Sequence, residues 1–464
     1  MQIIFHPVIF FTGKSADIYQ YFKDVIETKL KNIDETTIRN EYKMWIYQYY
    51  FLPSIRFLLT VHDITFTDIQ KLDSLSHRYL KKWAGIPRCG TNLIFHMRDG
   101  LNIPTIFSLY EEAHSLNHTA MRIKGDATVN SALDNCVSRE SQFQRKKSIT
   151  VRAEEVFKKA LNQNCIGGEL PSFPDETWDK EKNKLVNDIK DSIKSIVRVD
   201  TEEKSNEHLQ KLISQGEFLK FSQEEQSDSL WKSFIYNLKK GTMKFILNAR
   251  INTLPTMSNL KLWNKSSSDK CLLCKNKETT LHILIGCKVA LNQKRYTWRH
   301  DNIIRYICES VDKSKFEVFS DIEGFMCENG KTVPNFLTIT ADKPDIVILD
   351  HKKKKVDIFE LTVPFEKNIK ERNKNKNDKY AYLLKDITKY VPSVCAYEIG
   401  SRGSITSDNK ERLKRIHKFC DQKIKFRKFL EDIYEITMNS SYYIFMCRKE
   451  PTWSQVPSFG PCKN

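Results

Sequence analysis

Two acidic residues, Asp345 and Glu360, lie where neighbouring strands could bring their carboxylates together. Asp345 comes directly before the apolar run of residues 346–349, and Glu360 lies inside a second apolar run, residues 356–363. The polar residues between the two runs are few enough for a tight connection, so the sequence predicts a β-hairpin. The rest of the chain is best considered in relation to this hairpin.

The register of the hairpin decides whether the two acids meet. If Asp350 pairs with Lys355, Asp345 faces Glu360, and paired residues point to the same side of a sheet. Opposed carboxylates repel one another unless a cation lies between them. Mg²⁺ suits such a place, because proteins hold it through one or two carboxylates and leave other positions to phosphate oxygens. We therefore expect Mg²⁺ at this pair.

A basic helix is predicted to follow the hairpin. At steps of three and four residues it presents Arg372, Lys376, Lys379 and Tyr380 on one face. A metal ion held by acidic residues beside a lysine is an arrangement that can hydrolyse a phosphodiester. The alternative is structural: Pro-Asp often begins a strand, and a lysine-rich hairpin is usually just solvated.

A second set of side chains has the spacing of a zinc site. Cys271, Cys274, His282 and Cys287 follow the pattern C-x2-C, seven residues, H, four residues, C. Three thiolates and one imidazole complete the tetrahedral shell that structural Zn²⁺ prefers, with no position left open for catalysis. We expect a structural Zn²⁺ here, the alternative being four unrelated buried residues.

Composition narrows the class of partner. The chain has 464 residues, a formal net charge of +17 and a pI of about 9.1, which favours a nucleic acid over a membrane surface. Its 12 cysteines are mostly scattered, which is typical of a reducing compartment. No stretch approaches the roughly 18 consecutive apolar residues of a membrane span, and no secretory signal peptide is recognisable at the start.

The N-terminal half is predicted to be helical. Residues 74–92 contain an amphipathic helix that either packs on a bundle or lies along a duplex. Residues 120–230 indicate a solvated helical connector, whereas residues 231–260 interleave basic and aromatic side chains, a pattern that suits phosphate contact. The candidates for nucleic-acid contact are Lys239, Lys240, Lys244, Arg250, Arg299, Lys343 and Arg372.

The residues after the zinc pattern predict an α/β domain. A helix carries Arg299, His300 and Asp301, of which Asp301 is a candidate outer carboxylate of the acid pair. Further strand pieces are predicted at residues 317–319 and at Ile339, before the hairpin. A buried strand at residues 393–400 and a charged helix at residues 409–428 follow it. This order predicts a mixed sheet flanked by helices.

The stretch KPDIVILDHKKKKVDIFELTVPF resembles the restriction-like endonuclease of site-specific non-LTR retrotransposons of the R-element type, which insert into ribosomal genes. That signature is K/R-P-D, twelve to fourteen residues, then D/E, and fourteen residues separate Asp345 from Glu360 here. Thr362 stands where ordinary PD-(D/E)xK nucleases have their lysine. The resemblance therefore implies the variant whose lysine has moved to the next helix, as Lys376 or Lys379.

The resemblance extends over most of the chain and implies a domain order. It implies a thumb-like all-α remnant, a helical linker with a basic patch, a CCHC zinc knuckle, a PD-(D/E)xK nuclease domain and a flexible tail. Their boundaries are 1–120, 121–262, 263–300, 301–453 and 454–464. No Asp-Asp pair occurs in the sequence. The polymerase palm is thus missing, and we expect no reverse transcriptase activity from this chain alone.

The resemblance implies a nuclear, Mg²⁺-dependent endonuclease that nicks DNA, with element RNA and a full-length retrotransposon polymerase as further partners. Asp345 and Glu360 would hold Mg²⁺, Lys376 or Lys379 would steady the developing charge, and Tyr380 would support the helix or contact DNA. The competing hypothesis is a non-catalytic, zinc-containing nucleic-acid-binding relic of a retrotransposon polyprotein.

Overall fold

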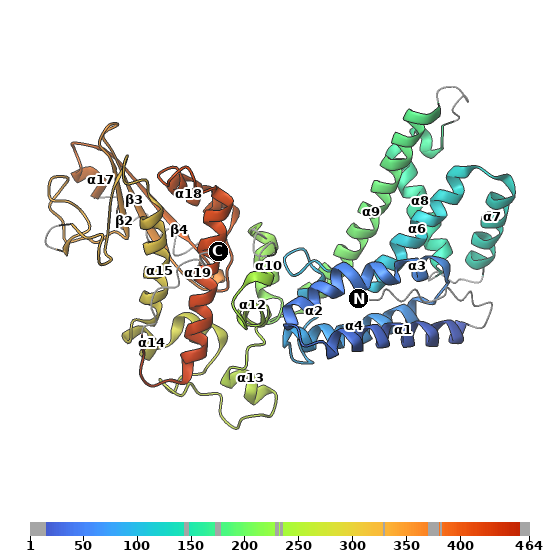
Figure 1. Cartoon of the computed structure of the whole chain (residues 1–464), viewed down its shortest axis with the longest axis horizontal. Coiled ribbons are helices and arrows are strands. Elements are labelled where there is room, and N and C mark those ends of the chain that lie inside the picture. The colour runs from blue at the N-terminus through green and yellow to red at the C-terminus, as the bar shows by residue number, and fades with distance from the viewer. Residues whose placement is uncertain are drawn as a thin grey trace. The chain divides into compact units, whose positions relative to one another are not determined.

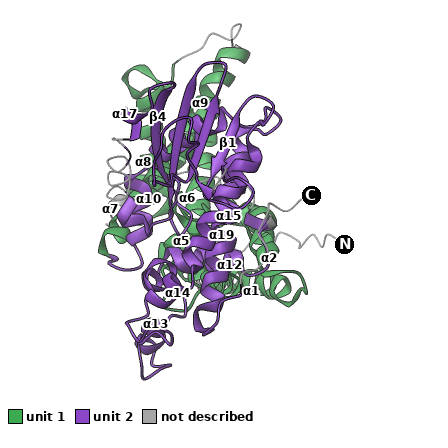
Figure 2. Cartoon of the chain, turned by 90° about the vertical axis from the view of Figure 1, so that its left-hand side faces the viewer, with its two compact units in different colours: residues 1–211 green, residues 212–464 purple. Residues whose placement is uncertain are grey.

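The computed structural model divides the chain into two compact units, residues 1–211 and residues 212–464 (Figures 1 and 2). The residues it describes are 15–142, 148–171, 178–227, 232, 235–327, 330–369, 380 and 383–454. Among them, no helix is both long enough and apolar enough to cross a membrane.

Unit 1 is helical throughout its described residues, as the sequence predicts. Thr65 and Thr105 cap α4 and α6 by accepting hydrogen bonds from backbone N–H groups of the first turn, and Gly85 and Gly125 end these helices in the left-handed region. The elements are α1 (Ser15–Glu35), α2 (Asn40–Ile46), η1 (Tyr47–Phe51), α3 (Leu52–Val61), α4 (Phe66–Ala84), α5 (Leu93–His96), α6 (Ile106–Lys124), α7 (Ala127–Gln142), α8 (Ile149–Asn164), η2 (Ile166–Gly168) and α9 (Trp178–Lys211).

A chain of hydrogen bonds joins α4 to α5 in unit 1. His96 Nδ1 lies 2.7 Å from the carbonyl oxygen of Ile103, so this nitrogen must donate. In neutral rings, Nε2 of His96 then accepts from Nε2 of His77 at 2.6 Å, and Nδ1 of His77 accepts from Asn92 at 3.1 Å. Every ring nitrogen is satisfied without a charge.

Unit 2 surrounds a four-stranded sheet with helices. Its elements are α10 (Glu217–Glu224), η3 (Ile235–Asn237), α12 (Thr242–Arg250), α13 (Met257–Leu262), η4 (His282–Gly286), α14 (Lys288–Asn292), α15 (Arg295–Ser310), β1 (Glu317–Ser320), β2 (Ile346–Asp350), β3 (Lys355–Thr362), η6 (Glu366–Asn368), α17 (Leu383–Asp386), β4 (Val391–Glu398), α18 (Ser407–His417), α19 (Phe426–Met446) and η7 (Cys447–Lys449).

The sheet is mixed, with the strand order β1-β2-β3-β4. β1 and β2 are antiparallel, as are β2 and β3, whereas β4 runs parallel to β3. Asp350 pairs with Lys355, which confirms the predicted hairpin register. The turn closes through Lys354, whose φ of 49° lies in the left-handed region that few side chains adopt.

Two apolar layers cover the two faces of the sheet. Ile346, Ile348 and Phe359 face a core built with α15, α18 and α19, whereas Val347 and Ile358 face a smaller core that includes Tyr380 and Leu383. The alternation follows from the period-two geometry of strands. It places the side chains at positions 345 and 360 on the face of the smaller core.

Two sequence expectations differ from the structure in unit 2, and a third lies mostly outside the described residues. The charged helix predicted over residues 409–428 is two helices, because α18 ends at His417 and α19 begins at Phe426. The predicted strand piece at Ile339 forms no strand. Of the basic helix predicted after the hairpin, the described part is Tyr380 and the short α17, and Arg372, Lys376 and Lys379 lie outside the described residues.

A buried ion pair joins the first helices of unit 2 to the sheet. Arg402 and Glu366 are both fully buried, with Nε of Arg402 2.6 Å from Oε2 of Glu366. The same guanidinium reaches Glu217 at 3.2 Å and Asn252 at 3.4 Å, and it stacks on Phe365 at 3.9 Å. The division between the two units at residue 211 falls inside the predicted linker, residues 121–262. The predicted domain boundaries stay predictions.

Candidate functional site

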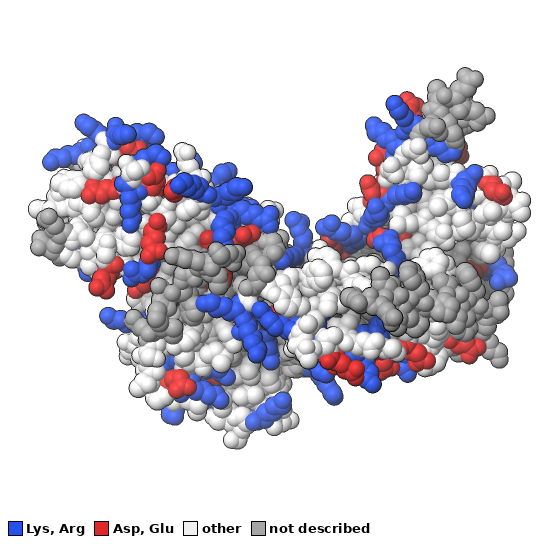
Figure 3. All heavy atoms as spheres, viewed as in Figure 1, with Lys and Arg blue, Asp and Glu red and all other residues white. Residues whose placement is uncertain are grey.

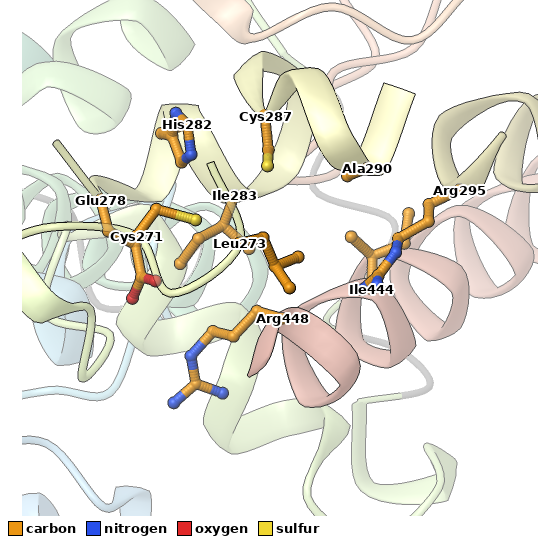
Figure 4. A pocket seen from close by; sticks show the side chains of 10 residues that line it. All are labelled: Cys271, Leu273, Glu278, His282, Ile283, Cys287, Ala290, Arg295, Ile444 and Arg448. Carbon is orange, nitrogen blue, oxygen red and sulfur yellow. The ribbon is translucent and has the colours of Figure 1, made fainter. Parts of the chain in front are cut away.

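The four predicted zinc ligands come together in unit 2. One ligand atom each from Cys271, Cys274, His282 and Cys287 lies within 4.8 Å of all the others, and Sγ of Cys274 lies 3.3 Å from Nε2 of His282. In Figure 4, Cys271, His282 and Cys287 border a small cavity that Arg295 and Arg448 also line.

Local backbone geometry delivers these ligands. A bridge between Lys270 and Lys277 closes a tight loop, in which the N–H of Cys271 donates to the carbonyl of Asn276 at 2.7 Å. His282 begins η4, and the N–H of Cys287 donates to the Tyr296 hydroxyl at 3.0 Å. The hydroxyl of Tyr296 ties the end of η4 to α15, because it also donates to carbonyls in η4.

The electrostatics of this cluster suit a soft divalent cation. Burial raises the pKa of the Cys271 thiol to about 11 and lowers the pKa of His282, which keeps the imidazole neutral. Burial also opposes ionisation of Cys274, but hydrogen bonds from the backbone N–H of Asn276 and from neighbouring thiols outweigh it and lower its pKa. Buried thiols crowded around one point are stabilised as thiolates when Zn²⁺ binds them.

The second site is the acid pair at the open ends of β2 and β3. The N–H of Asp345 donates to Oε1 of Glu360 at 3.1 Å, and the N–H of Leu361 donates to Oδ2 of Asp345 at 2.7 Å. Each carboxylate is thus held by the backbone of the opposite strand. Glu360 is buried, whereas the side chain of Asp345 keeps 15% of its exposure.

Tyr380 lies against this pair. Its ring is fully buried and its hydroxyl donates to the carbonyl oxygen of Lys343 at 3.4 Å. Burial, followed by the charge of Glu360 and a hydrogen bond to it, raises the pKa of the Tyr380 phenol. The hydroxyl therefore stays protonated and can donate beside the acids.

The sequence predicts Asp301 as the outer carboxylate, but the side chain that touches Asp345 is its neighbour His300. Nε2 of His300 lies 3.1 Å from Oδ2 of Asp345, and Nδ1 lies 3.0 Å from Oδ1 of Asp301. Burial opposes protonation of the imidazole, but the flanking carboxylates of Asp345 and Asp301 outweigh it and raise its pKa to about 10. No spacing rule in the sequence indicated this contact.

Two of the arginines predicted to bind nucleic acid are buried, whereas the predicted lysines are exposed. Arg250 is 2% exposed and donates to the Tyr434 hydroxyl at 3.2 Å. Arg299 is 1% exposed and donates to Oγ of Ser441 at 3.0 Å and to the carbonyl of Val363 at 3.2 Å. Both guanidinium groups are engaged inside unit 2, so we leave them out of any nucleic-acid surface.

The predicted lysines, by contrast, face solvent. Lys239, Lys240 and Lys244 are exposed near the start of α12. Lys343 is also exposed, with Nζ 3.4 Å from Oδ1 of Asp321. These four side chains are available to a polyanion.

A further basic surface, which the sequence showed only as a charged helix, lies where α18 ends and α19 begins. Its members are exposed and form no ion pair with a described residue: Arg415, Lys418, Lys423 and Lys425. Figure 3 shows lysine and arginine atoms gathered over the part of unit 2 where Figure 1 places α18. The density of Lys and Arg over residues 410–428 was the available signal.

Comparison with protein families identifies the class of the zinc site. Residues 214–293 match a family described as zinc-binding in reverse transcriptase, and this range includes all four ligands. A search of curated proteins finds no match. The family match and the Cys₃His cluster together support Zn²⁺ and a retrotransposon-related, zinc-binding protein.

Proposed function

We propose that this chain is a Mg²⁺-dependent DNA endonuclease of retrotransposon origin, with a PD-(D/E)xK-type site built on Asp345 and Glu360. The observation that carries the proposal is that each carboxylate accepts a hydrogen bond from the backbone of the opposite strand, Glu360 from the N–H of Asp345 and Asp345 from the N–H of Leu361. The zinc-binding match to reverse transcriptase proteins supports the origin. We assign the chain to the R-element type on the resemblance of its residues 343–360.

The donor set of the acid pair fits Mg²⁺. Both side chains offer hard oxygen donors, and they lie together because positions 345 and 360 continue the pairing of Ile346 with Phe359. A site with only two carboxylates suits Mg²⁺, which keeps its other positions for water and phosphate oxygens. When bound there, Mg²⁺ would polarise the scissile phosphate and acidify a water molecule.

The protein's own residues then have separate roles. Asp345 and Glu360 would hold the ion, and Tyr380 keeps a protonated hydroxyl close to Glu360. The amine of Lys376 or Lys379 would stabilise the negative charge that develops on the phosphate. These two lysines enter the proposal through the sequence resemblance alone.

We propose duplex DNA as the substrate and phosphate contact as the main mode of binding. The exposed lysines near the start of α12, Lys343 and the basic surface at residues 415–425 support a polyanionic partner. Affinity should then fall steeply as salt rises, because bound cations are released from the DNA. Element RNA and a full-length retrotransposon polymerase are the further partners we propose, with action in the nucleus.

A nicking assay tests the enzyme proposal. Supercoiled plasmid is incubated with the zinc-loaded chain and Mg²⁺, and open-circle product is measured for wild type, Asp345→Ala and Asp386→Ala. Asp386 is an exposed acid of the same unit and serves as the matched control. We expect nicking by wild type and Asp386→Ala, and its loss in Asp345→Ala.

Binding measured on the same plasmid separates this proposal from the competing one. If wild type binds DNA and leaves it intact with Mg²⁺ present, the chain is a non-catalytic nucleic-acid-binding relic. Nicking that survives Asp345→Ala would move the chemistry to another part of the chain.

A further inference from the structure

We propose that His300 is a positioning residue of the acid pair, which orients Asp345 for metal binding and is itself held by Asp301. This inference rests on the proposed function, since it concerns the same site. It adds a residue from α15 to a site otherwise built from β2, β3 and Tyr380.

The first argument is convergence on one oxygen. Oδ2 of Asp345 accepts from the N–H of Leu361 at 2.7 Å and from Nε2 of His300 at 3.1 Å. The two donors come from different elements, β3 and α15. A carboxylate held by one donor can still turn about its Cβ–Cγ bond, whereas two donors from fixed elements restrict that rotation.

The second argument is the environment of the imidazole. Both ring nitrogens of His300 lie within hydrogen-bond distance of a carboxylate, Nε2 at 3.1 Å from Oδ2 of Asp345 and Nδ1 at 3.0 Å from Oδ1 of Asp301. Side chains that bind a metal ligand in this way fix its orientation, and losing them typically costs about 10- to 100-fold in metal affinity.

The third argument is that α15 cannot shift easily. Arg295, in its first turn, donates to the carbonyls of Cys447 and Glu450 at 2.6 and 2.7 Å. Arg299, the residue before His300, donates to the carbonyl of Val363 at 3.2 Å, only three residues beyond Glu360. The helix is therefore fastened to the same strand end that carries the acid pair.

If His300 had only a structural role, its ring would be buried and its partners would lie away from the acid pair. His300 instead keeps 24% of its side-chain exposure, and Asp301 keeps 41%. The imidazole thus keeps some access to solvent while its two nitrogens contact the carboxylates of Asp345 and Asp301.

The experiment measures metal affinity and does not depend on cleavage. Mn²⁺, which stands in for Mg²⁺, is titrated into the zinc-loaded chain and followed by electron paramagnetic resonance. The variants are Asp345→Asn, His300→Phe, His300→Gln and His351→Phe. His351 is the matched control, because it too is a histidine held by an acid, Glu317 at 2.8 Å, but it lies at the other end of β2.

We expect Asp345→Asn to lose Mn²⁺ binding and His300→Phe to weaken it by about tenfold. His300→Gln, which keeps one donor, should recover part of the affinity, and His351→Phe should change nothing. The midpoint of thermal unfolding, measured without Mn²⁺, should stay similar in His300→Gln and wild type, which separates orientation of Asp345 from stability.

The outcomes separate the two claims. If Asp345→Asn loses Mn²⁺ while His300→Phe and His300→Gln both bind it like wild type, the role of His300 is overturned and the acid pair keeps its function. If Asp345→Asn binds Mn²⁺ like wild type, the proposed metal site itself is overturned, and the role of His300 with it. If His300→Phe does not fold, His300→Gln decides, since full affinity together with normal kcat and KM for nicking would contradict orientation by the ring.

Discussion

The zinc cluster and the acid pair are both polar sites in unit 2, but they are assembled in different ways. All four zinc ligands come from residues 271–287, and a short loop and η4 bring them together. The acid pair draws on Asp345, Glu360, Tyr380 and His300, which span 80 residues and four separate segments. The zinc ligands are brought together mainly by the backbone of one short segment. The acid pair instead depends on the sheet and on the position of α15.

The largest difference between the sites should appear on metal removal. Cys274→Ser should lose one equivalent of Zn²⁺, because it removes one of the four ligands. The surrounding residues should then unfold locally, since a structural zinc site contributes binding energy on the order of 10 kcal/mol to local folding. Metal analysis gives the stoichiometry, and hydrogen exchange over residues 257–296 reports the local unfolding. Cys136→Ser, an exposed thiol in unit 1, is the control. Unchanged zinc content in Cys274→Ser would contradict the assignment.

The next effect tests whether the two sites depend on one another. Glu366→Gln removes the buried carboxylate of the Arg402 pair and leaves only the partly exposed Glu217, which should destabilise unit 2 by about 3–5 kcal/mol. Since Arg402 also contacts Glu217 and Asn252 of the zinc-family region, exchange should rise at both sites together. Glu411→Gln, in an exposed pair with Lys414, should change stability by at most about 1 kcal/mol. Faster exchange at the sheet alone would show that the sites are independent.

A smaller effect distinguishes the acid pair as a metal site. Mg²⁺ at ten times its dissociation constant should stabilise the protein by about 1.4 kcal/mol, because it binds only the folded state. The corresponding rise in the midpoint of thermal unfolding is about 3–6 °C. Scanning calorimetry of zinc-loaded wild type and Asp345→Asn measures it. The shift should vanish in the variant, and an equal shift in both proteins would place the Mg²⁺ effect elsewhere.

The neutral histidine chain of unit 1 offers a further contrast with both charged sites. Burial lowers the pKa of His77 to about 3 and that of His96 to about 4, from an ordinary value of 6.5. The unfolded chain then binds protons more readily than the folded one. Stability from this pair is complete above pH 6.5 and is lost as the pH falls towards 4.

Thermal unfolding of wild type and His96→Gln between pH 7 and 4.5 measures this loss. The variant should lose less stability over that range, because one of the two depressed histidines is gone. Parallel pH profiles of stability for the two proteins would show that protonation of this pair does not change folding stability in that range.

Several features of unit 2 were predictable because they depend on short-range rules. The C-x2-C…H…C spacing identified the zinc ligands, and the apolar runs flanking the lysines identified the hairpin with Asp350 opposite Lys355. The charged segment over residues 409–428 was harder. Its composition favours one helix throughout, yet the chain breaks after His417 so that Phe419 and Phe429 can both pack in the core.

The amino-acid sequence by itself determined the zinc ligands, the hairpin register and the facing of Asp345 and Glu360, since each depends on residues close in the chain or paired by strand period. Only the tertiary structure decided that His300 touches Asp345, that Arg250 and Arg299 are buried, and that Arg402 joins α10 to the sheet. Those contacts join residues far apart in the chain. Residue type and spacing do not encode which distant elements pack together, because packing depends on the shape of the whole core.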